Sequence, residues 1–493
     1  MRQSLSRAAL GLLVLSFGVH GGQNLKPIRV WSDKELAEWA TPVAGLNVRP
    51  GHFSEQEYYA APPAEFYRTY PVYFPGREPK GYEEFLRSRK PEPLLLQKKR
   101  TKEEWIEAGK AVFRELDVAA VRSYDSALAE IVRSAEAFSK LGGKPLPDGT
   151  VAGLRWVPTD KGMALSIDEC AGCHTRVLEN GTRIDGAPIS GSGNGVIGRL
   201  ASQTILREFG DSPAEFNWRS SVVPWIPDDI HAGIRTMPPQ DLRSLFQAVI
   251  PGVFVRFNGS PYYPTKVPDL IGIGERRFID HTATHQLRNE GDLMRYAALV
   301  GCCDSADFGP HHVLTEKQRQ VRLRFPDELL FALAQYIYSL QPPQNPNQND
   351  PRIRVGKVVF DRENCAGCHT PPSYTNNKLT PAQGFTPQKD HPLLSSIMNV
   401  SVGTDPGLAL KTRKGTGFYK VPSLKGLWYR ERLSHDGSIT SLEEWFDAGR
   451  LRDDFEPSGF KGVAGARAVR GHEFGLRLNA EDKAALIAFL RSL

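Results

Sequence analysis

Two stretches of helical hydrophobic periodicity stand far apart in the chain. In both, leucine and aromatic residues recur about every three or four positions, as on one face of an α-helix. They are Leu329, Leu333, Tyr336, Ile337 and Leu340 in the first stretch, and Leu486, Phe489, Leu490 and Leu493 in the second. A chain of 493 residues exceeds what one hydrophobic core normally serves. The pattern therefore predicts two domains, each closed by an amphipathic helix.

Proline interrupts the hydrophobic pattern before and after the first of these domains. Residues 23–100 are rich in aromatics and proline, as at 58–63 and 70–75. Because proline breaks helix interiors, this segment is predicted to be an extended N-terminal arm. Residues 342–351 are polar and punctuated by proline, which is typical of a linker. The linker separates a first domain at 101–341 from a second at 352–493.

The first residues have the pattern of a secretory signal. Arg2 and Arg7 precede an apolar stretch from Ala8 to Val19, and small residues follow it. We therefore interpret residues 1–22 as a signal peptide and expect a periplasmic or extracellular protein. An uncleaved anchor is the alternative interpretation. No later segment approaches about 18 apolar residues, so stable membrane insertion is not expected.

The two domains share four sequence blocks in the same order. The blocks are GKAVF at 109–113 and GKVVF at 356–360, CAGCH at 170–174 and 365–369, KVPDLIG at 266–272 and KVPSLKG at 420–426, and the closing helices. The alignment of the two KVP blocks, continued without a gap, also pairs Arg276 with Arg430 and His281 with His435. The order predicts two tandem copies related by duplication.

The copies differ in their insertions. Phe360 precedes Cys365 by five residues, whereas Phe113 precedes Cys170 by 57. The first copy also has about 40 extra residues between its CAGCH and its KVP block. The second copy is therefore predicted to be compact, and the first to carry large loop insertions that can build a substrate pocket.

Composition and charge add little that is specific. The chain has 40% hydrophobic and 24% charged residues, as an ordinary globular protein does. Its net charge of +6 is small for this length, and its basic residues are mostly interspersed with acidic ones. Nucleic acid is therefore not an expected partner.

The two CAGCH motifs point to covalently bound haem. Two cysteines separated by two residues form thioether bonds to the haem vinyl groups, and the histidine that follows binds the iron. This predicts two haem c groups, held by Cys170, Cys173 and His174 and by Cys365, Cys368 and His369. Zinc is the competing interpretation, but it does not require a histidine directly after both pairs. The two remaining cysteines, Cys302 and Cys303, are adjacent and are assigned no function.

The sixth ligand decides what each haem can do, since a second strong ligand favours electron transfer and an open iron binds O₂ or peroxide. After the second CAGCH the candidates are His472, His435, His391 and Met398. In the first domain the candidate histidines are His231, His281, His285, His311 and His312. His281 and His285 have metal-ligand spacing on a helix, but the repeat pairs His281 with His435. The first haem is predicted to be open.

With two CAGCH domains in tandem, the chain resembles the bacterial di-haem cytochrome c peroxidase superfamily, which includes the MauG-type enzymes. The resemblance rests on KVPSLKG at 420–426, His435-Asp-Gly-Ser438 and the Leu442-Glu-Glu444 segment. In that family a Met or Tyr commonly stands directly before the His-Asp-Gly. Here the position is Ser434, a poor iron ligand.

Residues 419–493 are more similar to the rubber oxygenase branch, extracellular di-haem enzymes that cleave polyisoprene with O₂. The shared succession is KVPSL, Trp-Tyr-Arg, Glu-Trp-Phe and GHEFGL at 471–476. This resemblance implies His472 as the distal ligand of the second haem and O₂ binding at the first. It also implies a tryptophan between the haems, for which Trp156, Trp218 and Trp225 are candidates, and in some relatives a calcium ion.

The sequence thus predicts a mainly α protein of two tandem cytochrome c-like domains, with an extended N-terminal arm. We expect an exported haem-dependent oxidoreductase that activates O₂ or H₂O₂ at the haem of His174 and relays electrons through the haem of His369. Expected partners are an apolar organic substrate or a small redox-protein donor. A peroxidase or MauG-like oxidase and a non-catalytic electron carrier are the alternatives.

Overall fold

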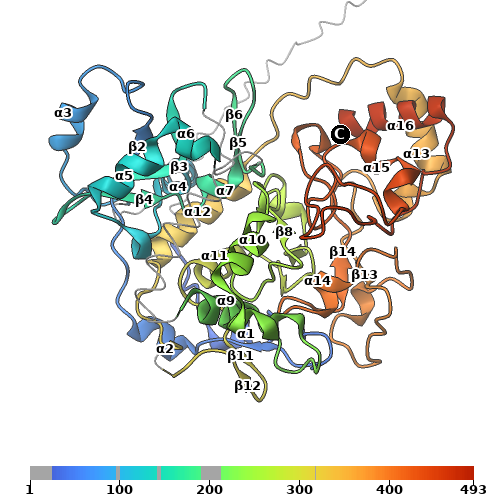
Figure 1. Cartoon of the computed structure of the whole chain (residues 1–493), viewed down its shortest axis with the longest axis horizontal. Coiled ribbons are helices and arrows are strands. Elements are labelled where there is room, and N and C mark those ends of the chain that lie inside the picture. Colours follow the sequence, from blue (N-terminus) through green and yellow to red (C-terminus); the bar gives the residue numbers. More distant parts are fainter. Residues whose placement is uncertain (1–24, 96–99, 141–145, 190–211, 317) are drawn as a thin grey trace, which may run out of the picture.

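The computed structural model describes residues 25–95, 100–140, 146–189, 212–316 and 318–493. It is 34% helical and 14% strand, so the expectation of a mainly α protein is wrong. Residues 25–341, which comprise the arm and the predicted first domain, lie on the left and in the centre of Figure 1, in blue to yellow. Residues 352–493, the predicted second domain, lie on the right, in orange to red. The predicted signal peptide falls outside the described residues.

One helix crossing organises the first domain. Helix α4 (Lys102–Glu115) packs along α12 (Asp327–Ser339), which confirms the amphipathic helix predicted there. At the crossing, a Cβ on Gly109 would lie 1.9 Å from the carbonyl oxygen of Ala332. Only glycine permits so close an approach of two backbones. Beside it, the rings of Phe113 and Tyr336 lie 5.5 Å apart.

The second domain repeats this crossing. Helix α13 (Ile353–Arg362) packs along α16 (Ala480–Ser492), the second helix predicted from periodicity. A Cβ on Gly356 would lie 2.0 Å from the carbonyl oxygen of Ala485. The rings of Phe360 and Phe489 lie 5.2 Å apart. The GK-x-VF blocks therefore mark equivalent helix contacts in the two domains.

The two longest strands that sequence periodicity missed lie in the insertion before Cys170. Strands β3 (Thr150–Thr159) and β4 (Gly162–Ile167) form a hairpin, and β2 (Tyr70–Tyr73) from the arm pairs with β3. Helices α5 (Ser126–Arg133) and α6 (Ala135–Lys140) lie beside this sheet (Figure 1). The insertion thus builds a layer of its own, with a separate hydrophobic cluster that includes Phe138 and Leu154.

The N-terminal arm is packed into the first domain. It carries the short elements α1 (Asp33–Leu36), β1 (Pro50–Gly51), α2 (Glu55–Ala60) and α3 (Tyr82–Arg87). Trp31, Trp39 and Tyr58 are fully buried in the same core as α4 and α12. The arm also bonds to the domain through its backbone, because Thr41 N donates to Thr284 O at 2.8 Å. The arm is therefore part of the core of the first domain.

The remaining elements are short. In the first domain they are η1 (Ala119–Val121), α7 (Ala171–His174), β5 (Thr175–Val177), β6 (Arg183–Asp185), α9 (Pro213–Ser221), η2 (Ile230–Thr236), α10 (Pro239–Gln247), β7 (Val253–Phe254), β8 (Thr265–Lys266), η3 (Ile273–Glu275), β9 (Phe278–Ile279), β10 (His285–Gln286), α11 (Glu290–Cys302), β11 (Asp307–Phe308) and β12 (His311–His312). In the second they are η4 (Cys365–Gly367), β13 (Leu379–Pro381), η5 (Leu394–Ser396), α14 (Gly407–Leu410), β14 (Phe418–Lys420), η6 (Leu427–Tyr429), α15 (Leu442–Trp445) and η7 (Ala448–Leu451).

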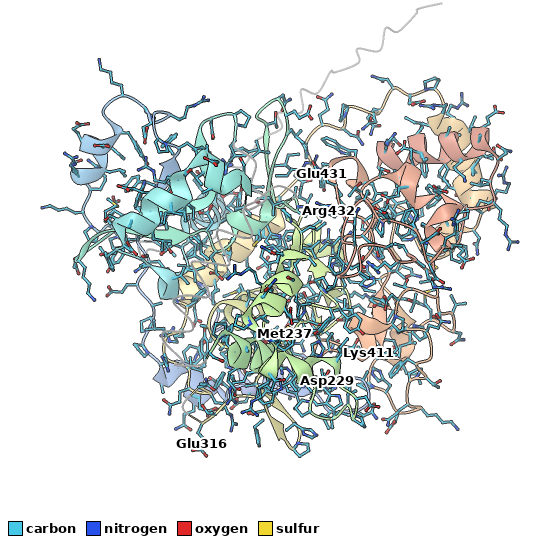
Figure 2. The ribbon with its side chains drawn as sticks, viewed as in Figure 1. Asp229, Met237, Glu316, Lys411, Glu431 and Arg432 are labelled. Carbon is cyan, nitrogen blue, oxygen red and sulfur yellow. The ribbon has the colours of Figure 1, made fainter. Side chains whose placement is uncertain are left out.

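The two domains meet through reciprocal hydrogen bonds between their KVP blocks. The backbone N–H of Lys266 donates to His435 O at 2.9 Å, and that of Lys420 donates to His281 O at 3.0 Å. The side-chain ammonium groups of the two lysines also form reciprocal bonds. Lys266 Nζ donates to Arg432 O, and Lys420 Nζ donates to Phe278 O. Figure 2 shows Arg432 where the two domains adjoin. Each domain thus presents the same surface to the other, as at a two-fold interface.

Within the described ranges, no helix is long and apolar enough to cross a membrane.

Candidate functional site

The first CAGCH motif forms a single helical turn, α7, directly after the β3–β4 hairpin. The N–H of His174 donates to Cys170 O at 3.0 Å, which closes the turn. The ring Nδ1–H of His174 donates to the carbonyl oxygen of Pro268 at 3.1 Å. That bond fixes the tautomer, so Nε2 is left with a free lone pair that can bind a metal.

The second motif has the same geometry. The N–H of His369 donates to Cys365 O at 2.8 Å, and its ring Nδ1–H donates to Pro422 O at 3.1 Å. Pro268 and Pro422 are the prolines of the two KVP blocks. The two KVP blocks therefore orient the two motif histidines in the same way, through the carbonyl oxygen of a proline.

His472 lies opposite His369. The two ring centroids are 6.2 Å apart, and the planes are inclined at 56°. Two metal–nitrogen bonds of about 2 Å, plus half the width of each ring, require a separation of about 6 Å. Burial, together with the neighbouring His369, lowers the pKa of His472 to about 4, so the ring is the neutral form that binds metals. The pair has the spacing of two axial ligands of one metal ion.

The other candidate ligands in the second domain are placed differently. The ring of His435 packs on Tyr419, with centroids 4.8 Å apart. His391 packs on Phe418. The Sδ of Met398 lies 3.6 Å from Nδ2 of Asn376, which donates to it. Of these residues only His472 has its ring against His369.

No aromatic or histidine ring faces His174 within the part of the chain that the structure describes. Burial raises the pKa of Cys173 and lowers that of His174, and the positive charge of Arg256 acts on both groups in the lowering direction. Arg256 also interacts electrostatically with Asp280 and Tyr296.

The five histidines considered for the first haem are held elsewhere. His281 Nε2–H donates to Lys266 O at 3.1 Å, and His285 packs on Trp39. The two histidines do not share a helix, although their spacing would suit one, because Asp280 and Ala283 have positive φ angles. His311 and His312 lie on hairpin strand β12.

His231 forms a Ser–His–Asp arrangement that is structural. Its Nδ1 lies 2.6 Å from Asp229 Oδ1, and its Nε2 lies 2.5 Å from Ser260 Oγ. However, Ser260 is fully buried and its oxygen also accepts the N–H groups of Tyr262 and Tyr263. The group holds two loops together near α9, where Asp229 is marked in Figure 2.

A cavity of about 60 Å³ lies between the two KVP blocks. Lys266, Lys420, Arg276 and Arg430 line it, and Asp269 is the single carboxylate among its lining residues. Burial, together with the neighbouring arginines, lowers the pKa of both lysines to about 7. Four cationic groups against one carboxylate favour an anionic ligand here.

Several contributing residues escaped sequence reasoning. Arg450 is fully buried and donates to the carbonyl oxygens of Gly471 and His472, both at 2.9 Å. Trp428, which no motif marked as a bridge, packs in the cluster that joins Ile271 of the first domain to the second. The three tryptophans proposed as bridges, Trp156, Trp218 and Trp225, are absent from the residues that line the cavity between the KVP blocks.

Two further expectations have no counterpart in the described ranges. No cluster of three or more His, Cys, Asp or Glu side chains is arranged to hold a metal ion there, and the calcium ion implied by the resemblance stays a prediction. Cys302 and Cys303 are free thiols, whose sulfur atoms both donate to Ala298 O.

No protein-family model and no curated protein matches the sequence. Solved structures that match include a hydrazine synthase of Kuenenia stuttgartiensis, with 14% identity, 47% of this chain and 73% of that chain covered, and a TM-score of 0.27. A MauG-like protein associated with microbial copper homeostasis has 17% identity, with 57% of this chain and 88% of that chain covered, and a TM-score of 0.29. A variant of the diheme peroxidase BthA from Burkholderia thailandensis has 16% identity, with 52% of this chain and 77% of that chain covered, and a TM-score of 0.27. At these identities and TM-scores the matches carry no argument about this chain, so its fold and function are argued from its own residues.

Proposed function

We propose that the protein is an exported di-haem c-type oxidoreductase. In this proposal the haem at His174 activates O₂ or H₂O₂, and the haem at His369 relays electrons. The observation that carries it is the difference between the two motif histidines. His369 faces a second imidazole at ligand distance, whereas His174 has no such ring contact among the described residues. An iron with two strong protein ligands is suited to electron transfer, and an iron with an open position can bind O₂ or peroxide.

The chain's own residues fit two haems. Each CAGCH turn presents two cysteines and a histidine whose Nδ1 is engaged by a proline carbonyl. The cationic cavity between the KVP blocks suits the propionate groups of haem, which need partners of opposite charge when they are buried. Zinc would leave both the cavity and His472 without a role.

A haem with one open axial position binds and reduces O₂ or peroxide when an electron source is available. The roles of the side chains follow from their places. Pro268 and Pro422 orient the two motif histidines, and Arg450 holds the loop that carries His472. Arg256 supplies a positive charge near His174, which would offset the negative charge that develops when a bound oxidant is reduced there.

The finer assignment to a rubber-oxygenase-like reaction rests on the sequence succession at 419–493. The insertion before Cys170 favours it, because an electron carrier has no use for an added layer around one haem. Under this assignment the partner is O₂ with an apolar organic substrate. A peroxidase or MauG-like oxidase is the second candidate, with H₂O₂ and a small redox-protein donor. Export to the periplasm or beyond rests on the signal pattern at 1–22.

The holoprotein is to be tested in two parallel incubations. In one it receives polyisoprene latex under O₂, and in the other H₂O₂ with a reduced small redox protein. Release of carbonyl-ended fragments supports the oxygenase, and donor oxidation matched to peroxide loss supports the peroxidase. Reversible electron exchange with no reaction in either incubation would make the protein an electron carrier and contradict the proposal.

A further inference from the structure

Two free thiols lie side by side at the C-terminal end of helix α11. Cys302 and Cys303 are the only cysteines outside the CAGCH motifs. Their sulfur atoms are 3.4 Å apart, and both donate to the carbonyl oxygen of Ala298 at 3.2 Å. Side chains of adjacent residues normally do not face each other on a helix. The shared acceptor turns these two toward one another, so the pair is arranged to react as a unit.

The two thiols differ in their access to solvent. Cys302 is half-buried, whereas only 3% of Cys303 is exposed, in the core that also holds α12. Burial raises the pKa of Cys303 well above its ordinary value, so this thiol stays protonated and inert towards dissolved reagents. A dissolved oxidant therefore reaches Cys302 first, and Cys303 reacts only with its neighbour.

A bond between these two sulfur atoms would strain the backbone. Adjacent Cα atoms are about 3.8 Å apart, whereas disulfides usually join Cα atoms about 4.4–6.8 Å apart. Strained disulfides are the more easily reduced, so such a bond is reversible. Helix α11 is held by its packing against α12. Cys303 lies just beyond the helix, with a φ angle of −152° and a ψ angle of 40°, so the movement falls on the residues that follow.

The residue after the pair belongs to a clamp between the two domains. Asp304 Oδ1 accepts from Asn258 Nδ2 at 3.0 Å, and Asn258 Oδ1 accepts from Arg413 Nε at 2.6 Å. Arg413 belongs to the second domain, is 2% exposed, and also donates to the carbonyl oxygens of Val222 and Arg219 in the first. Burial lowers the pKa of Arg413 to about 9, and the negative charge of Asp304 acts in the opposite direction. Displacing Asp304 would therefore loosen the hold on Arg413.

We propose that Cys302 and Cys303 form a redox site, which H₂O₂ closes to a disulfide and small-molecule thiols reopen, and that closure loosens the Arg413 clamp. The inference goes beyond the proposed function and does not depend on it, because the reaction needs no haem.

The closing reaction has two steps. The sulfur of Cys302 attacks one oxygen of H₂O₂, and the O–O bond breaks to leave a sulfenic acid and one water. The sulfur of Cys303 then attacks that of Cys302, and the S–O bond breaks to release a second water. In total the thiols lose two electrons and two protons, which reduce one H₂O₂ to two H₂O.

The holoprotein is to be treated with a small excess of H₂O₂ and digested, and the mass of the peptide with both cysteines is measured. C303A removes the second thiol but keeps a small apolar side chain in the core, and C302S removes the exposed thiol. Hydrogen–deuterium exchange of the peptides that contain Arg413 is recorded before and after treatment. The double variant C302S/C303A, given the same peroxide, controls for oxidation elsewhere in the chain.

We expect the wild-type peptide to lose two hydrogens and to regain them with a small-molecule thiol. C303A should instead gain oxygen at Cys302, and C302S should stay unchanged because its remaining thiol is buried. Closure should speed exchange around Arg413 by about tenfold, the effect of one weakened hydrogen bond to a charged group. The double variant should show no change.

Two results would overturn the proposal. One is a wild-type peptide that keeps both hydrogens in H₂O₂, and the other is closure without faster exchange around Arg413. The wild-type protein alone gives both readings, so the test stands even where a variant does not fold.

Discussion

The guanidinium group of Arg450 donates to the carbonyl oxygen of His472 at 2.9 Å, in a fully buried position. The same group also bonds the carbonyl oxygens of Trp445, Val469 and Gly471. His472 itself has a positive φ angle of 48°, which a histidine rarely adopts without support. Arg450 therefore fixes the backbone that presents the ring of His472 to His369.

Replacing Arg450 tests this positioning role. Lysine keeps the charge but lacks the planar fork of donors, so R450K is expected to leave some of the four carbonyl groups unpaired. We expect a loss of about 1–3 kcal/mol in unfolding free energy and a mixture of low-spin and high-spin second haem in the optical spectrum. The exposed pair Arg470 and Asp453 provides the control R470K. If the second haem stayed fully low-spin in R450K, Arg450 would not be needed to position His472.

His472 is the predicted distal ligand of the second haem. H472A should abolish the low-spin signal assigned to that haem and leave the first unchanged, because the only imidazole facing His369 in the described ranges is lost. H435A is the matched control, since His435 packs on Tyr419 instead. Resonance Raman spectra of both variants provide the measurement. If the spectrum of H472A were unchanged, the distal ligand of the second haem would be His435 or Met398 instead.

The helix crossings predict a sharp effect of small substitutions. In G356A, the new Cβ would lie 2.0 Å from Ala485 O, so α13 and α16 must move apart. Overpacking of this kind costs about 1–3 kcal/mol, and backbone contact places G356A at or above the upper end. G233A is the control, because a Cβ at Gly233 meets nothing within 4 Å. Urea unfolding of both variants checks the difference, and equal midpoints would contradict the crossing.

Periodicity and motifs predicted a limited part of this fold. The helices α12 and α16 follow from local patterns, as do the two CAGCH turns. The helical spacing of His281 and His285 was misleading, because the backbone at Asp280 and Ala283 takes left-handed angles. Duplication of the domains stays a prediction, although the equal crossings at Gly109 and Gly356 favour it.

The rest depends on contacts between distant segments. Arg450 and His472 are 22 residues apart, and His52 meets Ser305 across 253 residues. No local pattern marks Arg450 or His52, since each is surrounded by ordinary loop sequence. Such roles become visible only when burial and bonding partners are known.

Acid should destabilise the protein through His52. Burial lowers the pKa of His52 from 6.5 to about 4, so the unfolded chain binds the proton more tightly. Stability is therefore expected to rise with pH between about 4 and 6.5 and to be lost as the pH falls through that window. The contribution is at most about 3 kcal/mol.

Unfolding midpoints at several pH values will show this effect. H52Q should flatten the profile in part, because burial also lowers the pKa of the neighbouring His285. H312Q, at an exposed site, should leave the profile unchanged. Parallel profiles for the wild type and H52Q would contradict a buried neutral His52.

The most direct test of the central claim combines haem content with the spin states of the ferric holoprotein. Pyridine haemochrome absorbance, together with protein concentration, gives the number of haem c groups per chain, and EPR gives their spin states. The account predicts two haem c groups, one low-spin, held by His369 and His472, and one high-spin, held by His174. Two low-spin signals, or zinc in place of haem, would contradict it.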